Sequence, residues 1–350
     1  MKKLMWGLLA IPFSIAARIL GADTIVFFTS IVAILPLAGL MGQATEELAI
    51  HSGPRWGGFL NATFGNAAEL IIAIFLIFGG EAEVVKASLT GSIIGNILLV
   101  LGLALLVGGV RFKEQTFDSR VTGMHAASLI LAVIGLMMPA LFHRAVPNAE
   151  FVATESVSIG VATILIVLYV ASVIFSFATH SRELQVPPGH EVARWSRGKA
   201  LLVLIAATVF VALESEFLVH SLEPAVESLG ISKLFVGLIL VPIVGNAAEH
   251  GSAVILAAKN KMDVAIEIAV GSSTQIAMFL APLLVFISLI AGKPMDFFFT
   301  GFEIAAVGFS TAIVTLISID GRSNWLEGAQ LLAAYFIMAI SFFFLPGVLE

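Results

Sequence analysis

The chain has 350 residues, of which 59% are hydrophobic and 12% are charged, and its formal net charge is −6. Ordinary soluble domains carry about 25% charged residues, so this composition indicates an integral membrane protein without a soluble catalytic domain. The negative balance, with basic residues scattered singly along the chain, argues against a nucleic-acid partner. The lack of cysteine in the sequence excludes disulfides and thiolate metal sites.

The chain begins with an apolar segment behind two lysines, a pattern that signal peptides share. The pattern of a cleavage site is poor, because Arg18 directly follows the small residues Ala16 and Ala17. We therefore predict that residues 1–21 form an uncleaved transmembrane helix.

Ten more apolar segments follow, each with about the ~20 residues that a helical span needs. The predicted spans cover residues 24–50, 57–79, 84–109, 122–142, 155–179, 199–221, 232–258, 263–291, 297–318 and 326–346. These segments predict an all-α, polytopic membrane protein with about 11 transmembrane helices. Its expected parts are the N-terminal helix 1–21, a first five-helix repeat 22–180, a cytoplasmic linker 181–198 with a Pro-Pro-Gly turn, and a second, inverted five-helix repeat 199–350.

The positive charges predict how the chain is oriented in the membrane. If the spans alternate as predicted, thirteen of the 18 Lys and Arg residues lie on the side of the N-terminus and five on the other side. Positive charges collect on the cytoplasmic side of membrane proteins. We therefore expect a cytoplasmic N-terminus and a C-terminus outside.

The sequence Gly-Asn-Ala-Ala-Glu occurs twice, at 65–69 and at 245–249, each time within an apolar stretch. An ionisable side chain at membrane depth costs at least ~2.5–3.5 kcal/mol and therefore indicates a functional site. The match extends over 57–73 and 237–253, with eight identities in seventeen positions. Two related halves of five spans each must cross the membrane in opposite directions. This is the inverted repeat of secondary transporters, whose substrate site lies near the midplane.

Each motif offers a carboxylate and an amide three residues apart, Glu69 with Asn66 and Glu249 with Asn246, which share one face of a helix. The preceding glycine permits either a close backbone approach or a break in the helix. Two inverted copies would bring these groups together as an oxygen-rich site of charge −2. Ca²⁺ prefers six to eight oxygen ligands of this kind. Because desolvation favours the protonated carboxylic acid, protons compete with the cation for the same oxygens, which is a mechanism of exchange.

Neutral polar residues on the following spans are further candidates for the site. Ser92 and Ser272 occupy equivalent places in the two halves, and Asn96 and Gln275 lie farther along the same helices. These residues also suit helix packing, since Gly, Ser and Asn are common contacts between membrane helices.

Three more ionisable residues lie near the motifs. His250 follows Glu249 directly, but successive helical residues point about 100° apart, so we interpret it as a proton relay or hydrogen-bond partner rather than a ligand. Glu47 and Glu216 match across the repeat on the spans before each motif, which suggests a cation vestibule or a gate. A solvated helix end explains Glu47 equally well.

Three stretches, Gly-Asn-Ala-Ala-Glu-Leu at 65–70, Gly-Asn-Ala-Ala-Glu-His at 245–250 and Gly-Ser-Ser-Thr-Gln-Ile-Ala at 271–277, resemble the Ca²⁺/H⁺ exchangers, the CAX branch of the Ca²⁺/cation antiporter superfamily. The resemblance covers essentially the whole chain. It implies that Glu69 and Glu249 bind Ca²⁺ and protons in turn. It also implies that the site is lined by Asn66, Asn246, Ser92, Ser272 and Gln275.

The resemblance also bears on the counter-ion and the membrane. Sodium-coupled relatives typically have Pro before the motif carboxylate, where this chain has Ala68 and Ala248, and this departure favours protons. Vacuolar members tend to have a longer N-terminal tail and an acidic central loop. Their absence from this sequence favours a prokaryotic plasma membrane.

The sequence thus predicts a secondary antiporter, not an enzyme, that exports cytosolic Ca²⁺ in exchange for H⁺ by alternating access. Its expected partners are the two ions and the lipid bilayer, without a cofactor, and a homo-oligomer is left open. One alternative keeps the fold and couples Ca²⁺ or Mn²⁺ to Na⁺ or K⁺. A remote alternative is an intramembrane metalloenzyme, which needs a ligand set such as His-Glu-x-x-His that the sequence lacks. A purely structural role for the two glutamates predicts that their Gln variants still transport.

Overall fold

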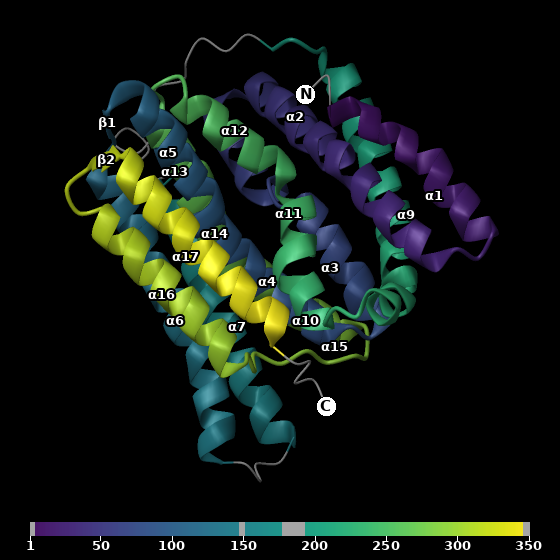
Figure 1. The fold of residues 1–350 in the computed structure, drawn as a ribbon. Coiled ribbons are helices and arrows are strands. Elements are labelled where there is room, and N and C mark those ends of the chain that lie inside the picture. Colours follow the sequence, from purple (N-terminus) through teal and green to yellow (C-terminus); the bar gives the residue numbers. More distant parts are fainter. Residues whose placement is uncertain (1–3, 147–150, 177–192, 346–350) are drawn as a thin grey trace.

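The computed structural model describes residues 4–146, 151–176 and 193–345 and is almost entirely helical (Figure 1). Among these residues, seven helices are long and apolar enough to cross a membrane, and an eighth span results if the bent pair 233–245 and 249–257 counts as one. Shorter apolar helices lie where three further spans are expected, at Leu4–Ile19, Ala67–Gly79 and Gly301–Ile317. The all-α, polytopic membrane fold is confirmed, whereas the number of eleven spans stays a prediction. Most of the predicted linker 181–198 lies outside the described residues.

The first half of the chain contains η1 (Leu4–Leu9), α1 (Ala10–Ile19), α2 (Asp23–Phe64), α3 (Ala67–Gly79), α4 (Ala82–Ile94), the π-helical turn η2 (Gly95–Val100), α5 (Leu101–Phe112), β1 (Glu114–Thr116), α6 (Ser119–Ala145) and α7 (Phe151–Ile174). The second half contains α9 (Arg197–Leu229), α10 (Lys233–Phe235), η4 (Val236–Leu240), α11 (Val241–Gly245), α12 (Ala247–Ala257), α13 (Met262–Ile266), η5 (Glu267–Gly271), α14 (Ser272–Gln275), η6 (Ile276–Leu280), α15 (Ala281–Ile290), α16 (Gly301–Ile317), β2 (Arg322–Asn324) and α17 (Trp325–Phe344).

Both predicted motif spans, 57–79 and 232–258, are broken rather than continuous. The first break falls at Gly65 and Asn66, between α2 and α3. In the second half the helices on either side of Asn246 are bent by 63°. Each Asn has non-helical dihedrals, with φ −95° and ψ 22° at Asn66 and φ −97° and ψ 5° at Asn246. The Asn lies just before the new helix and the Glu in its first turn, so the structure has the break that the preceding glycine permits, and the spans predicted as continuous are interrupted there.

Two other predicted boundaries are also wrong. The span expected at 297–318 begins only at Gly301, where Thr300 and Glu303 form a capping box, a signature of a helix start. Residues 293–300, which precede it, form neither a helix nor a strand; we call them the α15–α16 connector. The span expected at 199–221 continues to Leu229 as α9 and ends where Gly230 adopts a left-handed conformation.

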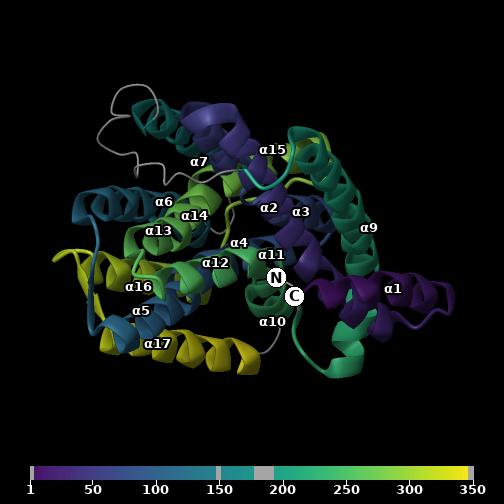
Figure 2. The ribbon, with the colours of Figure 1, turned by 90° about the horizontal axis from the view of Figure 1, so that it is seen from above.

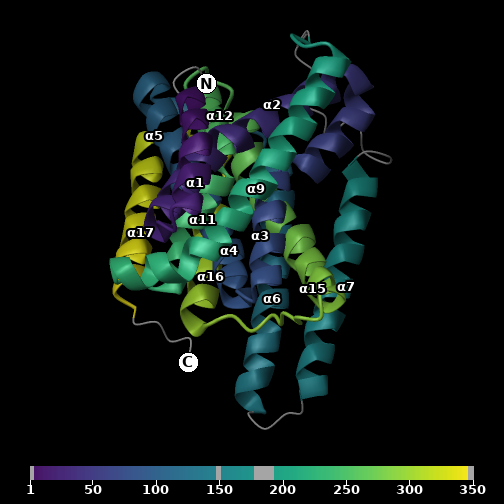
Figure 3. The ribbon, with the colours of Figure 1, turned by 90° about the vertical axis from the view of Figure 1, so that its right-hand side faces the viewer.

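The two halves meet along α4 and the segment η4–α11. At Gly91 on α4, an added Cβ would lie 2.0 Å from the carbonyl oxygen of Leu238 in η4, so the two backbones pack directly against each other. Figure 2 shows α4, α11 and α12 near the centre, with α1 and α9 on one side and α6 and α16 on the other. In Figure 3, α6 and α7 extend together beyond the other helices at one end of the molecule.

Candidate cation site

The first-half glutamate lies between a serine of its own half and an asparagine of the other half. Ser92 on α4 donates a hydrogen bond of 2.5 Å to Oε1 of Glu69 on α3. The side-chain amide of Asn246, at the α11–α12 break, donates to the same oxygen and also to Oγ of Ser92, at 3.1 Å. Each of the two halves therefore contributes to the environment of this carboxylate.

The serine of the second half makes the matching contacts with the halves exchanged. Oγ of Ser272 on α14 lies 2.9 Å from Oε2 of Glu249 on α12 and 3.0 Å from Oδ1 of Asn66. Thus each serine contacts the glutamate of its own half and the asparagine of the other half. The repeat predicted that the two motifs converge, and the structure adds this exchange of partners.

Gln275 and Asn96 extend the set of contacts around Ser272. The amide of Asn66 donates to Oε1 of Gln275, at 3.2 Å, and the amide of Asn96 donates to Oγ of Ser272, at 3.3 Å. Asn96 lies within the π-helical turn η2, and Ser272 follows the π-helical turn η5. Such turns occur often at functional sites. Each of the seven residues predicted to line the site, and Asn96 as well, therefore belongs to one of two hydrogen-bonded groups, one around Ser92 and one around Ser272.

The site is buried and rich in oxygen. The exposed fraction is 7% for Glu69, 8% for Asn66 and 2% for Asn246. Oε2 of Glu69 is buried and has no hydrogen-bond partner among the described residues, so this oxygen remains available to a cation or a proton. At Gly245, an added Cβ would lie 2.6 Å from Cγ of Glu69, which shows how closely the α11–α12 break packs against this side chain.

The breaks also set the electrostatics of the two carboxylates. Glu69 and Glu249 each lie in the first turn of a new helix, α3 and α12. The N-terminus of a helix carries a partial positive charge that stabilises a nearby carboxylate. The described residues contain no cluster of three or more acidic or histidine side chains suited to a metal. The oxygens therefore come from two carboxylates together with amide and hydroxyl groups, a set that suits a hard cation such as Ca²⁺.

The structure places the secondary candidates differently. Nε2 of His250 is buried without a hydrogen-bond partner among the described residues. Glu47 is buried, and its Oε2 accepts hydrogen bonds from the backbone N–H groups of Arg194 and Trp195, at 2.8 and 3.0 Å. Glu216 is exposed. Glu47 therefore holds the start of the second half, and the structure does not give the two glutamates equivalent surroundings.

The sequence reasoning missed the ionic contacts that flank the site. Lys86 on α4 is nearly buried and forms ion pairs with Glu83 and Asp296. Glu267 in η5 pairs with His125 on α6, with 3.0 Å between Oε2 and Nε2. A lysine or a glutamate inside an apolar stretch was a signal that could have identified both, since such residues are rare in membrane helices.

Comparison with known proteins places the chain in a family. The sequence profile described as "Sodium/calcium exchanger protein" matches residues 23–178 and 199–344. The chain belongs to this exchanger family. A protein of Aphanothece halophytica named Ca(2+)/H(+) antiporter is 46% identical over 98% of this chain and 96% of its own length. The Ca(2+)/H(+) antiporter ChaA of Bacillus subtilis is 46% identical over 96% of this chain and 97% of its own length.

A solved structure of a related protein agrees with the fold. The structure of native YfkE has a TM-score of 0.86 and 43% sequence identity, and the match covers 97% of this chain and 99% of that one. The two stretches that the exchanger profile matches each contain one motif glutamate, Glu69 or Glu249. The family expected from the three motif stretches is thereby confirmed.

Proposed function

We propose that this exchanger exports Ca²⁺ from the cytosol in exchange for H⁺, with Glu69 and Glu249 binding Ca²⁺ and protons in turn. The observation that carries the proposal is the reciprocal contact of each serine, Ser92 or Ser272, with the glutamate of its own half and the asparagine of the other half. The relatives at 46% identity are named Ca(2+)/H(+) antiporters, which supports the same ions for this chain.

The geometry explains why the two ions exclude each other. In this structure the polar groups of the site form hydrogen bonds with one another. A bound Ca²⁺ ion would replace these bonds, because it binds six to eight oxygen ligands. Without the cation, two bare carboxylates in a buried place are costly, so protons take its place. The access to the site then changes from one side of the membrane to the other with either the metal or the protons bound.

The electrical cost of moving Ca²⁺ outward favours exchange for protons over export of Ca²⁺ without a counter-ion. Moving two positive charges outward against ~100 mV costs about 4.6 kcal/mol, at roughly 2.3 kcal/mol per charge. Two protons that return inward cancel this electrical term, and a third makes the cycle electrogenic.

The proposal includes the finer placement in the membrane. The N-terminus is cytoplasmic, and the two five-helix repeats, 22–180 and 199–350, are inverted around the site in a prokaryotic plasma membrane. The chain acts as a transporter rather than an enzyme and needs no cofactor. His250 follows Glu249 directly in the sequence, and we assign its ring a role in proton transfer or as a hydrogen-bond partner.

The test uses purified protein in liposomes and measures Ca²⁺ uptake driven by a pH gradient in the absence of Na⁺. Uptake by the wild type that is lost in Glu69→Gln and in Glu249→Gln supports the proposal. Glu327→Gln is the matched control, because Glu327 fills a capping box at the start of α17 and Gln suits that position as well as Glu. Uptake that requires Na⁺ or K⁺ overturns the proton coupling, and uptake that survives both site substitutions overturns the site.

A further inference from the structure

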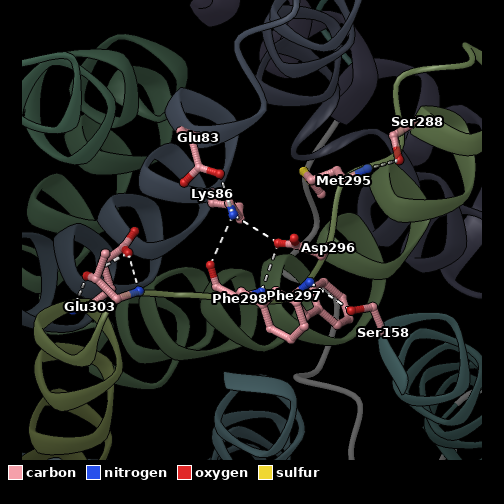
Figure 4. Close-up of polar contacts among 10 residues, drawn as sticks. Glu83, Lys86, Ser158, Ser288, Met295, Asp296, Phe297, Phe298 and Glu303 are labelled. Carbon is pink, nitrogen blue, oxygen red and sulfur yellow. Dashed lines mark hydrogen bonds and ion pairs between the residues drawn. The ribbon is translucent and has the colours of Figure 1, made fainter. Parts of the chain in front are cut away.

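Lys86 lies within a helix of the membrane domain, yet all of its hydrogen-bonding capacity is used. Its side chain is 5% exposed, and its Nζ lies 2.6 Å from Oε1 of Glu83 and 2.9 Å from Oδ1 of Asp296. Nζ also donates to the carbonyl oxygen of Phe298, at 3.0 Å (Figure 4). An ammonium group has three N–H donors, so each has an acceptor here. Two of the three acceptors belong to the α15–α16 connector, which comes from the other half of the chain.

The connector that Lys86 contacts is held mainly by side chains. Its apolar residues Met295, Phe297 and Phe299 are buried at alternating positions. Its backbone N–H groups donate to side-chain oxygens: Met295 to Ser288 at 2.8 Å, Phe297 to Ser158 at 3.1 Å, Phe298 to Asp296 at 3.1 Å and Thr300 to Glu303 at 2.8 Å (Figure 4). Non-helical backbone inside a membrane protein is tolerated only where it is buried in protein or lines a cavity. The connector is therefore a built element with a fixed path.

Two more contacts tie the second half to the turn between α3 and α4. Nζ of Lys293 donates to the carbonyl oxygen of Phe78 near the end of α3, at 2.6 Å. Nζ of Lys233 lies 2.9 Å from Oε1 of Glu81 in the turn itself. Together with the pair between Lys86 and Asp296, these contacts form a three-point clamp on the α3–α4 hairpin.

This hairpin carries the first-half part of the cation site. Glu69 lies on α3 and Ser92 on α4, and the two side chains bond to each other at 2.5 Å. Ser92 follows Lys86 by six residues, which is about 9 Å along a helix at 1.5 Å per residue. Because a short helix is rigid, contacts that fix the position of Lys86 also fix the position of Ser92.

The equivalent hairpin in the second half is held by a different set of contacts. Nε2 of Gln115 donates to the carbonyl oxygen of Ala257 at 3.0 Å and to Oδ1 of Asn260 at 2.8 Å. The backbone N–H of Asp118 donates to Oδ1 of Asp263 at 2.7 Å. This hairpin also has one pair of ionisable groups, Glu267 with His125. The first-half hairpin is held by lysines at three points.

We propose that Lys86 is a positioning residue for the cation site: its contacts with the α15–α16 connector fix the α3–α4 hairpin and so place Glu69 and Ser92 against Asn246 of the other half. This role rests on the proposed function, because the positioned groups are the Ca²⁺ ligands. Displacement of a binding group by about 1 Å can cost up to about 100-fold. Loss of the clamp is therefore expected to weaken Ca²⁺ binding rather than to stop the transport cycle.

The first test compares the Ca²⁺ dependence of uptake in the wild type, Lys86→Met and the double variant Lys86→Met with Asp296→Asn. The double variant removes the partner that the single variant leaves unpaired. We expect the KM for Ca²⁺ to rise about tenfold in both, with the rate at saturating Ca²⁺ within about twofold of the wild type. A lower melting temperature and a lower saturating rate at unchanged KM would show a merely structural role and overturn the proposal.

The matched control for this test is Arg322→Gln. Arg322 pairs with Glu114 at 3.5 Å, but both side chains are well exposed, at 63% and 58%. Exposed ion pairs contribute little, so the KM is expected to stay at the wild-type value. A rise in KM equal to that of Lys86→Met would show a general effect of lost charge and would overturn the specific role of Lys86.

A second readout does not depend on transport. The sequence contains no cysteine, so Ser288→Cys introduces a single thiol next to the backbone N–H of Met295, at a position that is fully buried in the wild type. The thiol is expected to react slowly with a water-soluble maleimide and faster once Lys86→Met is added, because the connector is released. An unchanged rate overturns the clamp. If the wild type shows no uptake driven by a pH gradient, the proposed function fails, and the thiol reaction still decides the clamp.

Discussion

The close approach of Gly245 to Glu69 predicts that one methyl group at residue 245 disturbs the cation site. An added Cβ would lie 2.6 Å from Cγ of Glu69, whereas ordinary van der Waals contact begins at 3.4 Å, so the Glu69 side chain must move by about 0.8 Å. That movement pulls its Oε1 away from Ser92 and Asn246. Overpacking of this kind costs about 1–3 kcal/mol. We therefore expect Gly245→Ala to weaken Ca²⁺ binding by about 5- to 100-fold.

The assay is Ca²⁺ uptake into liposomes at a fixed pH gradient, with the KM for Ca²⁺ measured beside the melting temperature. Gly251→Ala on α12 is the matched control, because an added Cβ there meets nothing within 4 Å. Alanine favours a helix over glycine by about 1 kcal/mol, so this control should melt at the same or a higher temperature with an unchanged KM.

Two results would refute this reasoning. A wild-type KM in Gly245→Ala, at an unchanged melting temperature, would mean that Glu69 does not occupy the place described. An equal loss in Gly251→Ala would mean that added helix propensity near the break, rather than contact with Glu69, impairs transport.

Two further predictions concern the contacts around the site. Ser272→Ala removes a hydrogen bond to a carboxylate, worth about 1.5–3 kcal/mol, and should raise the KM for Ca²⁺ about 10- to 100-fold. Ser273→Ala should change the KM little, because Ser273 contacts no residue of the site: its hydroxyl lies 2.9 Å from the carbonyl oxygen of Ala269 and 3.4 Å from that of Ile93. Gly91→Ala brings a Cβ to 2.0 Å from a carbonyl oxygen of the other half and should lower the melting temperature and the yield of folded protein. The same change at Gly95 meets nothing within 4 Å, and a similar loss there would contradict the close backbone contact.

Most residues of the site could be predicted from the sequence, because the motif occurs once in each half. An acid in an apolar stretch is conspicuous at any position, and two copies at a constant offset identify the equivalent serines as well. Asn66, Asn246, Ser92, Ser272 and Gln275 could therefore be named before the fold was known. Their roles in binding remain a proposal, whereas their convergence is a property of the structure.

Other parts of the site could not be read from the sequence. Glu47 looked equivalent to Glu216, yet it accepts two backbone hydrogen bonds near residue 195 while Glu216 is exposed. Glu303 is an acid within an apolar stretch of the sequence, and the structure places it in the capping box with Thr300 at the start of α16. A side chain's partner depends on what packs beside it, and residue type alone does not give that information.

The sequence by itself determined the membrane class, the two halves and the pair of glutamates, because hydrophobicity, repetition and rare buried charges are local properties of the chain. Only the tertiary structure decided that the helices break at the motifs, that each serine contacts the asparagine of the other half, and that Lys86 binds the α15–α16 connector. These contacts join residues 154 to 210 positions apart. Residues this far apart in the sequence come into contact only when the two halves pack against each other. The shapes of both surfaces together determine that packing.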